Sequence, residues 1–173
     1  MKDYIKGRAG VFIDAANILY SQQTLGWKVD YKKLKDYLIN QSFSAVFYYY
    51  TGKVGSLENQ LKFINKLENY GYVVIAKEVK FIRTKDGKQI PKGNLDIELA
   101  LDAFRFKDTY DTLLLFSGDS DFAYLLDLLK EYGKKTLVFS TRGHISKELL
   151  ERAKYIDLQK LRSFIELKFK EPR

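Results

Sequence analysis

Short apolar runs alternate along the chain with stretches whose apolar residues recur every three or four positions. The runs cover residues 10–13, 44–50, 72–76, 113–116, 134–140 and 155–158. Continuous apolar runs of this length predict strands that are buried on both faces of a sheet. The three- and four-residue spacing between them predicts helices. This alternation predicts an α/β fold with three layers, α/β/α, around a central and mainly parallel sheet.

Capping residues indicate where several of these helices begin and end. Ser56 precedes one helix that ends at Gly71, and Gly133 follows another, whereas Asp30 only begins a third amphipathic stretch. The last amphipathic stretch predicts a helix over about residues 159–169. Its apolar residues exceed what one short helix needs, so docking on the flank of the sheet and a homodimer contact both stay open. We expect a single domain over residues 1–173, with its core at about 10–158.

A basic segment interrupts the alternation at residues 77–92. Alternating polar and apolar residues followed by Asp86-Gly87 predict a β-hairpin near residues 77–90. Its candidate contacts to an RNA backbone are Lys80, Arg83, Lys85, Lys88 and Lys92. A solvated surface is the alternative for this charge run. Tyr48 and Tyr50, on the second strand, are either base-stacking residues or core.

Acidic residues follow two of the predicted strands. Asp119 and Asp121 come after the run 113–116, and Asp14 ends the first run with Asn17 three positions on. In open α/β sheets, ligands bind beyond the carboxyl ends of the strands. If the two strands are neighbours, the three carboxylates converge there. The alternative is that Ser120 or Asp121 only caps the following helix.

A fourth acid, Asp96, falls in the first turn of a helix predicted to start at Leu95. It shares a face with Leu99 and Ala103, which is unusual for an ionised group. Contact with the helix N-terminus is the alternative explanation. Four converging carboxylates repel one another, and a bound divalent cation would neutralise that repulsion.

The composition limits which metal ions and which kinds of partner are expected. The 173 residues include no cysteine and one histidine, so oxygen ligands and therefore Mg²⁺ or Mn²⁺ are expected. The formal charge is +8, and setting the four acids aside leaves +12, which favours a polyanionic partner. No apolar run approaches the length of a membrane span, and residues 1–10 do not form a signal peptide. We therefore expect a cytoplasmic protein without a membrane contact.

Three motifs carry a family resemblance. V-F-I-D-A-A-N, K-G-N-L-D-I-E-L-A-L-D-A and L-L-F-S-G-D-S-D-F, in this order, resemble the NYN domain family, LabA-like branch, of the PIN-like nuclease superfamily. The resemblance covers about residues 10–158. It implies a PIN-like fold and a ribonuclease dependent on Mg²⁺ or Mn²⁺. Its acidic positions match Asp14, Asp96, Asp119 and Asp121, and its asparagine matches Asn17. Many PIN relatives have a further acid in mid-chain, for which Glu78 is the candidate here.

The expected chemistry is hydrolysis of single-stranded RNA. We expect Asp14 and Asp119 to bind metal directly, and Asp96 and Asp121 to bind it directly or through water. Asn17 and Ser117 would orient these ligands or contact the phosphate. A non-catalytic RNA- or nucleotide-binding regulator is the first alternative. A phosphatase with Asp14 as nucleophile is the second, but Ala16 stands where its second acid belongs, and no phosphate-binding glycine loop is present.

Overall fold

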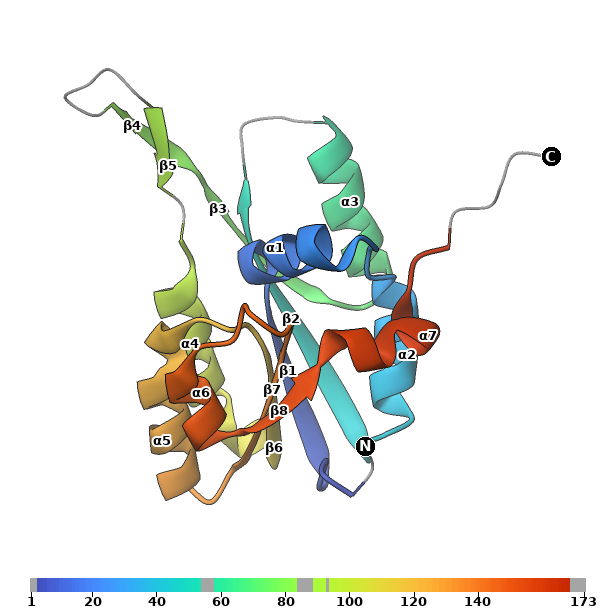
Figure 1. Cartoon of the computed structure of the whole chain (residues 1–173), viewed down its shortest axis with the longest axis vertical. Coiled ribbons are helices and arrows are strands. Elements are labelled where there is room, and N and C mark those ends of the chain that lie inside the picture. The colour runs from blue at the N-terminus through green and yellow to red at the C-terminus, as the bar shows by residue number, and fades with distance from the viewer. Residues whose placement is uncertain (1–2, 54–57, 84–88, 93, 169–173) are drawn as a thin grey trace.

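The computed structural model describes residues 3–53, 58–83, 89–92 and 94–168. Its centre is a sheet of parallel strands with helices on both faces (Figure 1). The strands are β1 (Arg8–Asp14), β2 (Ser44–Lys53), β3 (Val73–Glu78), β6 (Thr112–Phe116), β7 (Lys135–Ser140) and β8 (Lys154–Asp157). Their order is β3-β2-β1-β6-β7-β8, with every neighbouring pair parallel. The predicted three-layer α/β architecture is confirmed.

The helices begin and end largely where the capping residues indicate. They are α1 (Ala15–Leu25), α2 (Tyr31–Ile39), α3 (Glu58–Asn69), α4 (Asp96–Arg105), α5 (Ala123–Glu131), α6 (Lys147–Arg152) and α7 (Arg162–Ile165). The Asp30 side chain accepts from the backbone N–H groups at the start of α2. Gly71 and Gly133 have φ of +80° and +71°, the left-handed conformation in which helices often end. The proposed cap Ser56 lies outside the described residues.

Side chains on successive strand positions enter two separate hydrophobic layers. In β1, Val11 and Ile13 pack beneath α1, α2 and α7, whereas Phe12 packs against α4 and α5 on the other face. β6 is buried along its whole length and alternates in the same way. Burial on both faces explains why these strands are uninterrupted apolar runs in the sequence.

The strand register brings the ends of β1 and β6 together at the centre of the sheet. Ile13 is paired with Phe116, so Asp14 and Ser117 leave the sheet side by side. From β1, one half of the chain builds outward through β2 and β3, and the other through β6, β7 and β8. This is the kind of switch point at which open α/β sheets bind ligands.

A separate antiparallel hairpin extends away from the sheet beside β3 (Figure 1). It consists of β4 (Lys80–Arg83) and β5 (Gln89–Lys92), with Ile82 opposite Ile90. The hairpin begins at Lys80 rather than at residue 77, because β3 continues to Glu78 and pairs with Lys53. The Asp86-Gly87 turn, Lys85 and Lys88 lie outside the described residues, as do the side chains of Lys80, Arg83 and Lys92.

The prediction of a continuous helix over residues 159–169 was wrong. The chain forms a 3₁₀ turn, η3 (Leu158–Leu161), then the single turn α7, and becomes extended at Glu166. There the backbone pairs with a neighbouring segment instead of with itself: Glu166 bridges Val29, and the Leu167 N–H donates to the Lys28 carbonyl at 2.8 Å. Leu158, Leu161 and Ile165 are buried on the flank of the sheet.

The two tyrosines proposed for base stacking belong to the packed interior of the sheet. Tyr50 is buried, and its hydroxyl donates to Asp102 Oδ2 at 3.1 Å. Tyr48 is half-buried and stacks between Phe12 and Phe106, with ring centroids 4.7 and 5.3 Å away. Within the described residues, no helix is long and apolar enough to cross a membrane.

Candidate metal centre

Asp14 is held by the ends of two strands. Its Oδ1 accepts from the N–H groups of Ala16 and Asn17 at 3.1 and 3.2 Å, which makes it the N-cap of α1. Its Oδ2 accepts from the Ser117 hydroxyl at 2.9 Å. Burial raises the pKa of Asp14, and these hydrogen bonds partly oppose that rise because they stabilise the carboxylate. The carboxylate therefore has a fixed orientation at the end of β1.

The loop after β6 is ordered by its own acid. Asp119 Oδ1 accepts from the Asp121 N–H at 3.0 Å and caps the 3₁₀ turn η2 (Ser120–Phe122). The cap is thus Asp119, not Ser120 or Asp121. Asn17 Oδ1 accepts from the Gly118 N–H at 3.0 Å, which ties this loop to α1. One Asp119 oxygen is used by the cap, and the other has no partner within the described part of the chain.

Asp96 starts α4 and faces the same edge of the sheet. Asn94 Oδ1 accepts from the Asp96 N–H at 2.7 Å, and the Asn94 amide donates back to Asp96 Oδ2. Burial and the nearby charges of Asp14, Asp119 and Asp121 raise the pKa of Asp96 to about 6. Both its burial and the neighbouring carboxylates therefore disfavour the ionised form of Asp96.

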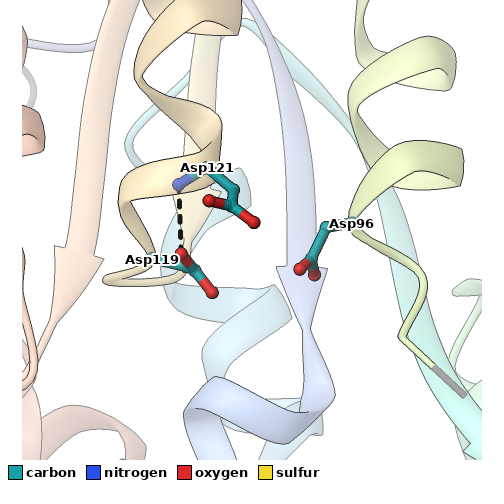
Figure 2. Close-up of side chains that lie close together, drawn as sticks. All are labelled: Asp96, Asp119 and Asp121. Atoms are coloured by element: carbon teal, nitrogen blue, oxygen red, sulfur yellow. Dashed lines mark hydrogen bonds between the residues drawn. The ribbon is translucent and has the colours of Figure 1, made fainter. Parts of the chain in front are cut away.

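Asp96, Asp119 and Asp121 form one cluster, in which each offers a carboxylate oxygen within 4.8 Å of the others. Figure 2 shows Asp96 approaching from α4, with Asp119 and Asp121 facing it from the loop after β6. Oxygens that ligate one Mg²⁺ at about 2.0–2.1 Å are at most about 4.2 Å apart. Neighbouring ligands on the same ion are only about 3 Å apart, so the three side chains would close further around a bound ion. The hard oxygen donors and their excess negative charge fit Mg²⁺ or Mn²⁺.

Asp14 lies beside this cluster but is not one of its three members. Its charge acts on Asp96, and the charge of Asp119 acts on Asp14, so the four acids share one electrostatic site. Other acids nearby serve different partners: Asp102 accepts from Tyr50, and Glu98 pairs with Lys77. The mid-chain candidate Glu78 is exposed at the end of β3 and is not in the cluster.

A second loop, residues 141–146, packs behind the acidic loop. The Ser146 N–H donates to the Gly118 carbonyl at 2.9 Å, and the His144 ring nitrogen Nε2 lies 2.6 Å from the Thr24 hydroxyl on α1. A Cβ on Gly118 would lie 1.9 Å from the His144 carbonyl oxygen. Only glycine allows this close approach, which explains the S-G-D sequence between the strand and the acids.

A groove of about 1410 Å³ opens from the acids toward α1 and α3. Its acidic end includes Asp14, Asn17, Asn94, Asp96 and Asp119. Its far part is lined by Leu19, Tyr20, Gln23, Trp27, Tyr31, Tyr49, Thr51, Gln60 and Phe63. Val79, which directly precedes the hairpin strand β4, also lines it.

The fold and the site together define a three-layer α/β protein with a carboxylate centre at the switch point of its sheet. The family model of the NYN domain matches residues 8–159, and the chain belongs to this family. It is 36% identical over 164 residues to the low amplitude and bright protein LabA of Synechococcus elongatus, covering 92% of this chain and 88% of that protein.

A solved structure shares the fold. The crystal structure of a protein of unknown function, VPA0982 from Vibrio parahaemolyticus, superposes with a TM-score of 0.73 at 24% identity and covers 94% of this chain and 98% of that one. The PIN-like fold and LabA-like family membership expected from the sequence are therefore confirmed. Membership supports a nuclease-type or RNA-related role, because the family generally comprises nucleases that usually use divalent metals.

Two features of the site were not predicted from the sequence. Asn94 orders Asp96 from two residues upstream, and the signal for it was the Asn-x-Asp spacing, which commonly forms a local side-chain turn. The aromatic groove left no local signal, because its lining comes from α1, β2 and α3, which are distant in sequence.

Proposed function

We propose that this protein is a metal-dependent endoribonuclease that hydrolyses phosphodiester bonds of single-stranded RNA. The observation that carries the proposal is the cluster of Asp96, Asp119 and Asp121 oxygens within 4.8 Å, with Asp14 beside it, in an NYN domain. We assign Asp14, Asp96, Asp119 and Asp121 as ligands to Mg²⁺ or Mn²⁺. A cation held there would lower the pKa of a bound water and neutralise charge that develops on the phosphate.

The surrounding side chains keep these carboxylates in position. Ser117 donates to Asp14 and accepts from the Asp119 N–H, so it sets two of the ligands relative to each other. Asn17 uses its carbonyl oxygen on Gly118, which leaves its amide NH₂ group to donate to a phosphate oxygen at the head of the groove. Asp96 and Asp121, on opposite sides of the cluster, orient the attacking water.

RNA as the substrate is supported by the charge of the chain and by the family. The formal charge of +8 attracts a polyanion toward a site whose own carboxylates repel it. The hairpin β4–β5 follows Val79, which lines the groove, and we assign Lys80, Arg83, Lys85, Lys88 and Lys92 to the RNA backbone. Contacts of this kind position a strand without reading its bases.

The decisive experiment is cleavage of a fluorescently labelled single-stranded RNA with Mg²⁺, with Mn²⁺ and with EDTA. We expect internal cleavage with either metal, none with EDTA, and a loss of at least about 100-fold for Asp14→Asn and Asp119→Asn. Asp36→Asn is the matched control, because Asp36 is an exposed acid on α2 that pairs with Lys32.

Cleavage that persists in EDTA, or in both site variants, would contradict the proposal. Metal-dependent RNA binding by the wild type without any cleavage would instead establish the non-catalytic regulator considered above.

A further inference from the structure

The groove next to the carboxylates has a volume and a lining that metal binding by the carboxylates does not explain. Its volume of about 1410 Å³ exceeds the roughly 300–1,000 Å³ typical of pockets for one small molecule. Beyond the aspartates, its lining is mainly aromatic, apolar or amide-bearing, and Glu166 is a further acid there. Among the described lining residues, Lys28 is the one cation. The groove thus suits an extended ligand whose uncharged parts face the protein.

Two aromatic side chains on different helices line this groove and remain exposed. Tyr20, on α1, is 61% exposed, and no ring contact or hydrogen bond involves it within the described part of the chain. Phe63, on α3, is 37% exposed. Large aromatic side chains that are left uncovered on a groove wall provide stacking surfaces.

The aromatic side chains that contact Phe63 also line the groove and carry hydroxyl groups. Phe63 packs edge-on against Tyr31 and Tyr49, with ring centroids 5.7 and 6.0 Å away. The Tyr31 and Tyr49 hydroxyls are 3.4 Å apart, and the Tyr72 hydroxyl donates to the Tyr31 carbonyl at 2.7 Å. The contacts with Tyr31 and Tyr49 therefore fix the Phe63 ring, and its exposed surface lines the groove.

We propose that this groove is a nucleobase-binding subsite, in which Tyr20 and Phe63 stack on bases of the single-stranded RNA whose phosphate is held at the acids. This inference rests on the proposed function and specifies how its substrate is bound. A base is joined to its phosphate through one ribose, so a phosphate held by a cation at Asp96 and Asp119 would place a neighbouring base over the adjoining lining. Because the groove has few cations, it suits uncharged bases better than phosphates. We therefore expect the bases to lie in the groove and the other phosphates to lie at the outer surface.

The test uses nucleoside 5′-monophosphates, which have no internucleotide bond and therefore bind without RNA cleavage. Isothermal titration in Mg²⁺ would compare uridine and adenosine 5′-monophosphates with ribose 5-phosphate, which has the phosphate but no base. We expect both nucleotides to bind at least about tenfold more tightly than ribose 5-phosphate. Stacking tolerates every base, so the two nucleotides should differ by less than this.

Variants locate the effect on the groove. Tyr20→Ala should weaken nucleotide binding at least about fivefold and leave ribose 5-phosphate unchanged, whereas Tyr20→Phe should retain binding. Tyr124→Ala is the matched control, because Tyr124 is a 77% exposed tyrosine on α5 outside the groove. For Phe63→Ala the control is Phe164→Ala, which also removes a partly exposed phenylalanine packed against a tyrosine. Since Tyr20 is 61% exposed and no ring contact or hydrogen bond involves it within the described residues, its variant should test binding without loss of fold.

Equal affinities for nucleotide and ribose 5-phosphate, or equal effects of Tyr20→Ala and Tyr124→Ala, would overturn the subsite. A third result would also overturn it: an apolar dye that binds in the groove and is not displaced by excess nucleotide. The groove would then take an apolar ligand. Failure of the proposed function appears separately, as RNA that stays intact with the wild type in Mg²⁺ and Mn²⁺.

Discussion

The Ser117 hydroxyl donates a 2.9 Å hydrogen bond to Asp14 Oδ2 and accepts one of 3.2 Å from the Asp119 N–H. One buried side chain thereby joins Asp14, at the end of β1, to Asp119, in the loop after β6. The relative position of these acids depends on this hydroxyl as well as on the strand pairing.

Replacing Ser117 by alanine should impair the site more than the fold. We expect Ser117→Ala to lower metal affinity or cleavage by about 10–100-fold, the usual cost of losing a residue that orients a ligand. It should lower the free energy of unfolding by about 1–2 kcal/mol, because Asp14 Oδ2 loses its donor. Ser120→Ala, an exposed serine in the same loop, is the control and should change neither quantity.

Metal binding should stabilise the folded chain through Asp119. Mg²⁺ or Mn²⁺ at about 100 times its dissociation constant adds about 2.7 kcal/mol to the free energy of unfolding, seen as a rise in melting temperature. We expect Asp119→Asn to abolish the rise and Asp36→Asn to preserve it. An equal rise in both variants would remove Asp119 from the ligands.

Asp96 should make the metal-free protein less stable as pH rises. Its pKa is about 6 in the folded chain against an ordinary value of 3.8, so the folded state binds more protons than the unfolded state between these values. Stability contributed by this group is therefore full below about pH 4 and lost by about pH 6. Metal-free Asp96→Asn should be more stable than the wild type at pH 7, on the order of 1 kcal/mol.

Denaturant unfolding at pH 4 and pH 7 with EDTA measures this difference. The gap between the two proteins should close at the lower pH. A gap that is independent of pH would show that charge repulsion at Asp96 is not its cause.

Gly118 should tolerate substitution far less well than glycines that only end helices. In Gly118→Ala the new Cβ would lie 1.9 Å from the His144 carbonyl oxygen, so the two loops behind the site would have to separate, at about 3 kcal/mol. Gly26 has φ of +71° and nothing within 4 Å of an added Cβ, so Gly26→Ala should cost about 1 kcal/mol from backbone conformation alone. Equal costs in a denaturant titration would contradict the close packing.

The hairpin should contribute a salt-dependent part of RNA affinity. Replacing Arg83, Lys85 and Lys88 by alanine should weaken binding about equally for all sequences and flatten the dependence of affinity on salt, because fewer counterions are released. A variant in which the exposed Lys130, Lys135 and Lys160 are replaced controls for net charge. If the hairpin variant keeps the wild-type slope, Arg142 and Lys147 become the next candidates for the RNA path.

The sheet and the placement of its acids could be predicted because their signals are local. An apolar run that is followed by Asp14, or within three residues by Asp119, gives both a buried strand and the edge at which the acid lies. The parallel order then brings the two ends together, as the pairing of Ile13 with Phe116 shows. Asp96 was recognisable because it is a charge on an otherwise apolar helical face.

What remained unpredictable depends on contacts between distant segments. The periodicity after residue 158 fits a helix, but the pairing of Glu166 with Val29 ends it after one turn. Tyr48 and Tyr50 resemble stacking residues in the sequence, and only their packing against Phe12 shows that they are core. Tyr20 and Phe63 line the same groove although they are 43 positions apart in the sequence. No local sequence pattern predicts this.

The separation of Asp14 and Ser117 by 103 positions also constrains the order of folding. A chain that has paired only β1, β2 and β3 lacks the loop with Asp119 and Asp121, so it has half of a binding site at most. Such long-range pairing closes a large loop and forms late. An ion bound by all the acids would therefore act on the unfolding rate, leaving refolding nearly unchanged, and the protein would gain kinetic resistance from its ligand.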